Sequence, residues 1–313
     1  AKNLDKLYVL AWQPSLDSGL SANVKLISLS GSKIKKIFKV WGVMIKILPK
    51  VDGVWTHMMP EYPVLVGMCC KLFNKKLIHW YAHGAVPFTL KLSRLFVNEY
   101  ITSSAKGFRM KTKKPAVVVG QGIVVCEKTK KEKTDDQFRI VSVGRISPSK
   151  DYESMIKAIY ELNNKSVQLK IVGAPASRSD ENYLSSLKEM VNKMSLAGQI
   201  EFTGGVAHEK INDLLAEADL FLNLSSTGSL DKAVLEAMNM GVLVLVGNEA
   251  FENILPEKLK TKRDNPEILK NKILEIMNLS TEEKNRMSLN LKEEVRENHS
   301  LKKMMQRVVE RFK

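Results

Sequence analysis

The chain has 313 residues and a formal net charge of +15, from 49 lysines and arginines against 34 acidic residues. It is longer than a single hydrophobic core usually serves, which predicts two domains. A hydrophobic content of 44% with only 17 glycines and 10 prolines excludes an intrinsically disordered chain and a collagen-like one.

The basic excess lies entirely in the first part of the chain. Residues 1–134 hold 23 lysines and arginines against 7 acidic residues, whereas residues 135–313 hold 26 against 27. The first part therefore carries +16 and the second −1. This asymmetry indicates that the first part meets an acidic partner.

Cysteine usage indicates a reducing compartment. Cys69 and Cys70 are adjacent in an apolar run that is expected in the core, and the three cysteines offer neither a disulfide framework nor the spacing of a metal site. We therefore expect a cytoplasmic protein. No apolar stretch reaches the roughly 20 residues that a membrane-spanning helix needs, and no signal peptide is visible.

Short β-rich runs alternate with amphipathic helical patterns from the start of the chain. In the first half, strands are expected at residues 7–12, 24–28, 54–57, 77–81, 100–102 and 117–119, and helices at residues 33–48, 62–73 and 88–98. In the second half, strands are expected at residues 139–143, 168–172, 200–202, 220–223 and 242–246. Helices are expected at residues 152–162, 182–194, 210–217 and 232–240, and again from residue 266 onward.

This alternation predicts an α/β chain with parallel sheets and helices on both faces. A polar, lysine-rich break at residues 127–137 is interpreted as a linker. We predict two doubly wound, Rossmann-like domains that face a cleft, residues 1–134 and residues 135–313. Ligands of such sheets bind at the carboxyl ends of the strands.

The stretch from residue 220 to residue 241 combines a buried strand, a loop of small residues and a helix that begins near Ser229. Free backbone amides at that helix start, beside Thr227 and Gly228, can bind an anion. Glu236 lies about a turn and a half into the helix and can accept hydrogen bonds from the hydroxyls of a ribose. Taken alone, the pattern is more simply a capped helix with a solvated glutamate.

A second loop, after the strand at residues 139–143, carries Gly144, Arg145 and Lys150. The fork of an arginine and the point charge of a lysine together suit a pyrophosphate. Two cations in a loop are usually just solvated. Their order along the chain with the glycine turn at Gly204 and the block at residues 225–236 argues instead for one binding site.

These motifs resemble the donor domain of the retaining "group 1" glycosyltransferases, the family-4 enzymes of GT-B fold, over residues 139–247. The first half is similar to the acceptor domain of the same family, most clearly at residues 77–84 (LIHWYAHG) and 101–104 (ITSS). The resemblance covers essentially the whole chain, with the stronger motifs in the second half.

The resemblance implies a nucleotide-sugar donor bound mainly to the second domain, as a co-substrate, with no other cofactor and no metal. Family positions that hold the pyrophosphate match Arg145, Lys150 and the amides from Gly228 through Ser229 to Leu230. The position that holds the ribose matches Glu236. The acceptor-domain histidine of the family, which lies beside the donor sugar, matches His83. The implied reaction is metal-independent transfer with retention of anomeric configuration.

The chain departs from the family pattern in two places. The family carries two glutamates eight positions apart, and the first of them falls here on Gly228. Asp231 is the nearest acid and either recognises sugar hydroxyls or caps the helix. The family also begins with a strand and a glycine-containing loop that nothing before Leu4 supplies, so the chain is expected to lack that edge of the acceptor site.

Residues 32–50 predict an amphipathic helix. Its apolar side chains share an arc of roughly 120° that is expected to pack on the sheet, with its lysines on the other side; the apolar set is Ile34, Ile37, Phe38, Trp41, Met44, Ile45 and Leu48. With the other lysines and arginines of the first half, this helix predicts a basic face that meets an anionic membrane surface. Nucleic acid is not expected, because no nucleic-acid fold signature accompanies the charge.

Several polar residues are weaker candidates. His57 follows a strand and is a candidate cleft residue with Glu61 as its partner, and Asn248 at a strand end is a minor candidate for donor contact. His79 alternates inside a buried strand pattern and is expected in the core. His299 is expected as an exposed helix cap.

We expect a cytoplasmic retaining glycosyltransferase that moves a sugar from a nucleoside diphosphate to a glycan or lipid-linked glycan at the inner membrane face. Three alternatives remain. A non-catalytic sugar-nucleotide-binding relative is motivated by Gly228 and by the start of the chain. A nucleotide-sugar epimerase shares the fold but not the pairing of the Arg145–Lys150 loop with the block at residues 225–236. A basic nucleic-acid-binding protein is the fourth reading.

Overall fold

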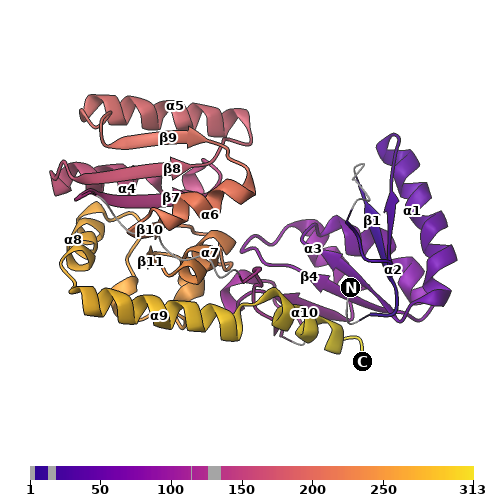
Figure 1. The fold of residues 1–313 in the computed structure, drawn as a ribbon. Coiled ribbons are helices and arrows are strands. Elements are labelled where there is room, and N and C mark those ends of the chain that lie inside the picture. The colour runs from indigo at the N-terminus through magenta and orange to yellow at the C-terminus, as the bar shows by residue number, and fades with distance from the viewer. Residues whose placement is uncertain (1–3, 13–18, 114, 126–134) are drawn as a thin grey trace. The chain divides into compact units, whose positions relative to one another are not determined.

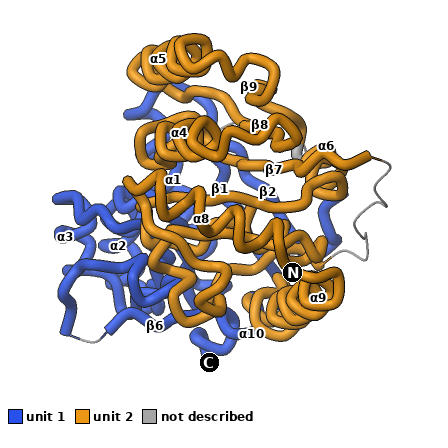
Figure 2. The backbone as a smooth tube through the Cα atoms, turned by 90° about the vertical axis from the view of Figure 1, so that its left-hand side faces the viewer, with its two compact units in different colours: residues 1–119, 305–313 blue, residues 120–304 orange. Residues whose placement is uncertain are grey.

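The chain divides into two compact units (Figure 2). The computed structural model describes residues 4–12, 19–113, 115–125 and 135–313. The first unit comprises residues 1–119 and 305–313, and the second comprises residues 120–304. The boundary therefore lies before residues 127–137, the predicted linker, most of which falls outside the described residues. Residues 305–313, placed by the sequence in the second domain, pack with the first unit.

The second unit is built on one parallel sheet of five strands. The strands are β7 (Phe138–Val143), β8 (Val167–Val172), β9 (Ile200–Gly204), β10 (Leu220–Asn223) and β11 (Leu243–Val246). Their order in the sheet is β11-β10-β7-β8-β9, and Figure 1 shows them succeeding one another from β9 to β11. The strands β10 and β11 are buried at every position, as expected for a parallel sheet covered on both faces.

The helices of the second unit form two groups. The first comprises α4 (Tyr152–Leu162), α5 (Arg178–Lys193) and α8 (Pro266–Met277); the second comprises α6 (His208–Ala216), α7 (Lys232–Met240) and α9 (Thr281–Asn298). Within the first group α4 packs against α5 and α8, and within the second α7 packs against α6 and α9. Because strand order runs outward from β7 to β9 and then returns to β10, right-handed crossovers place the two groups on opposite faces.

The return of the chain creates a switch point between β7 and β10, the two neighbouring strands from which the sheet extends in opposite directions. Loops that leave the carboxyl ends of such a pair diverge toward opposite faces and leave a crevice between them. The fold therefore selects the loops after Val143 and Asn223 as the place for a ligand.

The first unit holds two smaller parallel sheets. The strands β1 (Leu7–Ala11) and β2 (Val24–Ser28) form one, and β3 (Gly53–His57), β4 (Lys76–Trp80), β5 (Glu99–Thr102) and β6 (Val117–Val118) form the other in that order. Its helices are α1 (Lys33–Ile47), α2 (Glu61–Leu72) and α3 (Phe88–Ser93). Cys70 is buried between α2 and the strands, as predicted, and burial raises the pKa of its thiol to about 12.

The last residues of the chain are anchored in the first unit. They follow α10 (Leu301–Glu310). The Arg311 guanidinium forms an ion pair with Glu99 at 2.6 Å, and the Lys76 ammonium donates to the Arg311 carbonyl. A Cβ on Gly53 would meet the ring of Phe312 at 2.6 Å, so this glycine leaves room for the ring.

The orientation predicted for the helix at residues 32–50 is wrong in part. The structure buries Val40, Met44 and Leu48, whereas Ile34 and Phe38 are among the exposed large apolar side chains. The buried arc is centred on Val40 and Met44, because those side chains reach the cluster that contains Leu29 and Cys70. The apolar arc of the helix is thus wider than the strip that the sheet covers. Among the described residues, no helix is both long and apolar enough to cross a bilayer.

Alanine substitutions at two helical glycines of the first unit are expected to change the stability in opposite directions. A Cβ on Gly67 in α2 would overlap the Phe96 side chain, whereas a Cβ on Gly42 in α1 meets nothing within 4 Å. We expect Gly67→Ala to lower the free energy of unfolding by about 1–3 kcal/mol through overpacking. We expect Gly42→Ala to raise it by up to about 1 kcal/mol through helix propensity. Urea denaturation of both variants measures the difference, and equal effects would contradict the packing at Phe96.

Candidate active site

The loops after β7 and β10 are tied together by a buried ion pair. The Lys150 ammonium lies 3.0 Å from Asp231 Oδ2, and both side chains are more than four-fifths buried. The same carboxylate oxygen accepts a hydrogen bond from Asn223 Nδ2 at 2.9 Å. A backbone hydrogen bond of 3.1 Å from Ser226 to Ser149 joins the loops a second time. The two predicted binding segments therefore form one surface at the switch point.

The first loop is a tight turn that places its lysine. A short 3-10 helix, Pro148–Lys150, ends at Asp151, whose φ of 52° is left-handed. The Asp151 carboxylate accepts from the backbone of Ser154 and of Asp264, at 3.4 and 2.8 Å, which fixes the start of α4. Arg145 on the same loop is exposed and has no hydrogen bond or ion pair with any other described residue. Its guanidinium is thus available to an anion.

Glycines lie at the ends of three neighbouring strands, and Gly173 permits a close approach of two of them. A Cβ on Gly173, which follows β8, would overlap the Gly144 carbonyl oxygen. The Gly173 amide in turn donates to the Gly204 carbonyl at 3.0 Å. Gly144 and Gly204 were expected at the site, whereas Gly173 was missed. The signal available was its position directly after a buried strand, where a glycine indicates close backbone approach.

The second loop contains a series of hydroxyl contacts and one residue with a positive φ. Thr227 Oγ1 lies 3.2 Å from Ser225 Oγ and 3.1 Å from Ser229 Oγ. Gly228 has a φ of 68°, a conformation that disfavours side chains such as the glutamate that the family carries here. The carbonyl of Ser229 accepts from Asn248 Nδ2 at 2.8 Å, so Asn248 supports the loop from β11.

Asp231 occupies the N-cap position of α7, yet its side chain caps no helix amide. Its carboxylate instead serves Lys150 and Asn223. Of the two roles left open by the sequence, side-chain capping is wrong, and sugar recognition stays a prediction. Glu236 is half-buried in the second turn of α7, and Leu230 is buried just before its first turn.

His83 lies in the first unit, shortly after the end of β4. Its side chain is exposed, and the Ala85 amide donates to His83 Nδ1 at 3.0 Å. A neutral imidazole that accepts at Nδ1 carries its proton on Nε2. His83 can therefore donate from Nε2 to a ligand. The Arg109 guanidinium packs over Gly84, where a Cβ would meet its central carbon at 2.8 Å.

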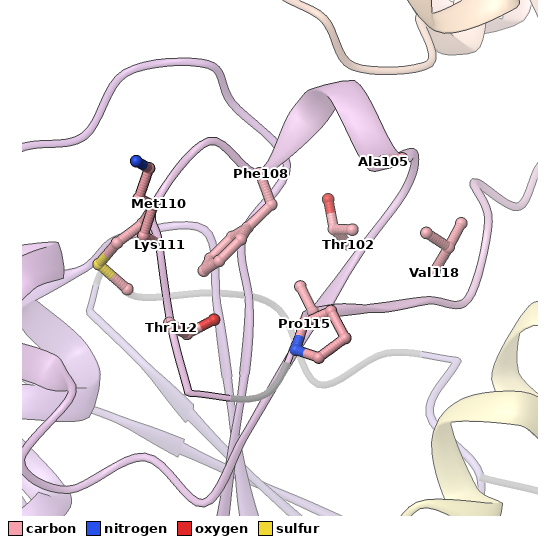
Figure 3. A pocket seen from close by; sticks show the side chains of 9 residues that line it. Thr102, Ala105, Phe108, Met110, Lys111, Thr112, Pro115 and Val118 are labelled. Atoms are coloured by element: carbon pink, nitrogen blue, oxygen red, sulfur yellow. The ribbon is translucent and has the colours of Figure 1, made fainter.

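A cavity of about 500 Å³ opens beside the end of β5 in the same unit (Figure 3). Its lining includes Thr102, Phe108, Lys111 and Thr112. Phe108 also forms an isolated parallel bridge with His83. Phe108 thus both lines the cavity and pairs with His83 through the backbone.

The predictions for the remaining histidines have different outcomes. His79 is fully buried and lies 2.9 Å from Thr56 Oγ1 through Nδ1, which confirms its place in the core. His299 is a C-cap as expected but is buried, so its predicted exposure is wrong; its neighbour on α9 is Glu294 at 3.4 Å. His57 stacks on Trp80 at the end of β3, while a role beside Glu61 stays a prediction.

Residues 126–294 match the sequence profile of the family described as "Glycosyl transferases group 1". This match covers more than half of the chain. The chain belongs to this family. The finding confirms the resemblance seen in the loop that carries Lys150 and in the helix that carries Glu236.

Curated relatives of this group 1 chain match it over about two fifths of its length. The "Phosphatidylinositol N-acetylglucosaminyltransferase GPI3 subunit" of Saccharomyces cerevisiae is 24% identical over 134 residues, which are 42% of this chain and 29% of the relative. The "Alpha-monoglucosyldiacylglycerol synthase" of Streptococcus pneumoniae is 25% identical over 126 residues, 40% of this chain and 28% of the relative. The matched segment thus spans less than a third of these relatives.

Solved structures cover nearly the whole chain. The Anabaena protein Alr3699/HepE in complex with UDP has a TM-score of 0.75 at 16% identity, over 92% of this chain and 85% of that one. A glycosyltransferase from Rickettsia africae has a TM-score of 0.77 at 17% identity, over 99% and 98%. These likenesses show the fold and confirm the predicted GT-B class.

The buried ion pair predicts a measurable contribution to stability. Asp231→Ala leaves the Lys150 ammonium and the Asn223 amide without their shared acceptor. We expect the free energy of unfolding to fall by about 1–3 kcal/mol. The control is Glu201→Ala, which removes the more exposed pair with Lys170 at 3.2 Å and is expected to cost less than about 1 kcal/mol. Chemical denaturation compares the two, and equal losses would contradict the role of Asp231.

The buried histidine predicts a pH dependence of stability. Desolvation lowers the pKa of His79 to about 4, from about 6.5 in the unfolded chain. Its contribution is therefore complete above pH 6.5 and is lost as the pH falls toward 4, by about 3 kcal/mol at most. His79→Gln should flatten this part of the stability profile relative to the parent chain. Urea midpoints between pH 4 and 7 measure both, and an unchanged slope in His79→Gln would exclude this assignment.

Proposed function

We propose that the protein is a retaining, metal-independent glycosyltransferase that takes its sugar from a nucleoside diphosphate. The acceptor is a glycan or a lipid-linked glycan, met in the cytoplasm at the anionic inner face of a membrane through the basic first unit. No nucleic acid is involved. The observation that carries the proposal is the junction of Lys150, Asp231 and Asn223 at the switch point, with Arg145 exposed beside it.

The diphosphate is held where negative charge grows during transfer. As the bond between the sugar and the diphosphate breaks, the leaving oxygens gain charge and the sugar becomes oxocarbenium-like. Arg145 and Lys150 supply fixed positive charges, and the amides from Gly228 to Leu230 supply the start of α7. Asp231 and Asn223 hold Lys150 in place before the donor arrives, so little reorganisation is needed.

The other contacts orient the donor and the acceptor. Glu236 accepts hydrogen bonds from the ribose hydroxyls. His83, with its proton on Nε2, donates to the donor sugar. The cavity beside Phe108 offers space for part of the acceptor. Alignment of donor and acceptor by these groups supplies much of the rate.

A second candidate function is supported by Gly228. The family places a glutamate there, and in this chain the nearest carboxylate, Asp231, is already engaged by Lys150. A protein that binds a sugar nucleotide without transferring the sugar would tolerate this change. Binding without donor hydrolysis or transfer would favour this second function.

Thermal shift with UDP-, GDP- and ADP-sugars tests donor binding. One nucleotide series should raise the melting temperature by about 5–10 °C at roughly 100 times its Kd. The ligand-induced shift should vanish in Glu236→Ala and shrink in Lys150→Ala, each compared with its own ligand-free protein. Lys165→Ala, an exposed lysine of the same unit, should keep the full shift. No shift with any of the three series would refute the proposal.

Transfer itself is followed by product analysis. The anomeric configuration of the product, read by NMR, should equal that of the donor. Activity should persist in EDTA if Arg145 and Lys150 carry the charge neutralisation. An inverted product or loss of activity in EDTA would contradict the corresponding part of the mechanism.

A further inference from the structure

The first unit exposes an apolar ridge on two helices. We define the α1–α2 ridge as Ile34, Phe38, Trp41 and Ile45 of α1 with Met68 and Leu72 of α2. Their exposed fractions run from 40% for Trp41 to 76% for Leu72. The four residues of α1 are spaced by four, three and four positions, so they lie on one face of the helix. Apolar side chains gathered in this way, rather than scattered singly, mark an interaction surface.

Contacts between the helices make the ridge one surface. Trp41 Nε1 donates to the Leu65 carbonyl of α2 at 2.9 Å, and the rings of Phe38 and Trp41 meet edge to face with centroids 5.7 Å apart. Leu65, Met68 and Leu72 share a face of α2 at spacings of three and four. The indole of Trp41 therefore joins the apolar stripe of α1 to that of α2.

Lysines border the ridge on its other side. Lys35, Lys39 and Lys46 lie about a quarter turn further round α1 from Phe38, on the side away from Trp41 and α2. The helix contains no acidic residue, and residues 18–51 contain none either. Within the described part of the chain, none of the α1 lysines is paired with a carboxylate; Lys39 donates to Ser30 instead. The stripe next to the ridge is therefore uncompensated positive charge.

This combination fits a lipid surface better than a protein surface. The centre of a protein–protein interface is depleted in lysine, and a second copy of this chain would bring two sets of lysines together. At a bilayer surface, aromatic and aliphatic side chains enter the boundary between headgroups and acyl chains, while lysines reach the phosphates. Anionic headgroups match the charge of the stripe.

We infer that the α1–α2 ridge docks the protein on anionic bilayers, with the apolar side chains inserted and the bordering lysines on the lipid phosphates. The inference deepens the proposed function, because it names the surface that meets the membrane. It differs from a purely electrostatic contact of the first unit in requiring Ile34 and Phe38 at the lipid.

Vesicle co-sedimentation tests the ridge. The chain should bind vesicles of phosphatidylglycerol and phosphatidylcholine, and pure phosphatidylcholine far more weakly. Ile34→Ser with Phe38→Ser should reduce binding by at least about tenfold, because two large apolar groups no longer insert. The matched control, Leu289→Ser, changes an equally exposed leucine on α9 of the second unit and should bind as the parent. Unchanged binding in the double variant would overturn the inference.

A charge series tests the lysines. Lys35→Gln with Lys46→Gln should weaken binding to anionic vesicles several-fold and reduce its salt dependence. Lys188→Gln with Lys193→Gln removes the same charge from α5 and should have no such effect. Equal losses in both pairs would show that net charge, and not this surface, governs binding.

Tryptophan fluorescence reports whether the α1–α2 ridge inserts into the bilayer. Lipids brominated in the acyl chain should quench the emission of Trp41, and Trp41→Phe should abolish that quenching while circular dichroism stays unchanged. Absence of quenching in the parent would contradict insertion. Light scattering without lipid should show a monomer; a dimer that Ile34→Ser with Phe38→Ser dissociates would assign the ridge to a second copy instead.

Each of these variants is also assayed for the thermal shift with sugar nucleotides. The ridge variants should keep the full shift of the parent, since their residues lie on the first unit, outside the donor loops. If the parent shows no shift but the ridge variants lose vesicle binding, the proposed function fails and the inference stands. If the parent shows the shift but the ridge variants bind vesicles as the parent does, the inference fails and the proposed function stands.

Discussion

One carboxylate organises the site. Asp231 accepts from Lys150 and Asn223, and these three residues come from the two loops and the strand end that meet at the switch point of the sheet. The ion pair is more than four-fifths buried, so the solvent competes with it only weakly. It fixes the ammonium before any anion arrives. The conformation of both loops, including the left-handed Gly228, is consistent with this arrangement.

Much of this architecture can be predicted because strand–helix alternation and loop chemistry are local patterns. The loop that carries Gly144 and Lys150 can be predicted from the sequence alone. The strands of the second unit lie close to the apolar runs that predict them. The partner of Lys150 could not be predicted, because the pairing joins residues 81 positions apart. Gly173 was missed for a similar reason, since its neighbour Gly144 lies on another strand.

The prediction for α1 was wrong in part because periodicity reports how wide an apolar arc is, but not how much of it the rest of the protein covers. Val40 and Met44 reach the cluster under the helix, whereas Ile34 and Phe38 extend past it. The same helix also holds five of the lysines that give the first part of the chain its charge. Positive charge and exposed apolar side chains therefore coincide on this helix.

The anchoring of residues 305–313 in the first unit bears on how the protein is made. Arg311 pairs with Glu99, and Phe312 fills the space beside Gly53. On a ribosome these residues emerge after the whole second unit. The contacts that residues 305–313 make in the first unit can therefore form only after the second unit has been synthesised. Synthesis order and folding order are thus uncoupled in this protein, and an unfinished chain leaves Glu99 without its arginine.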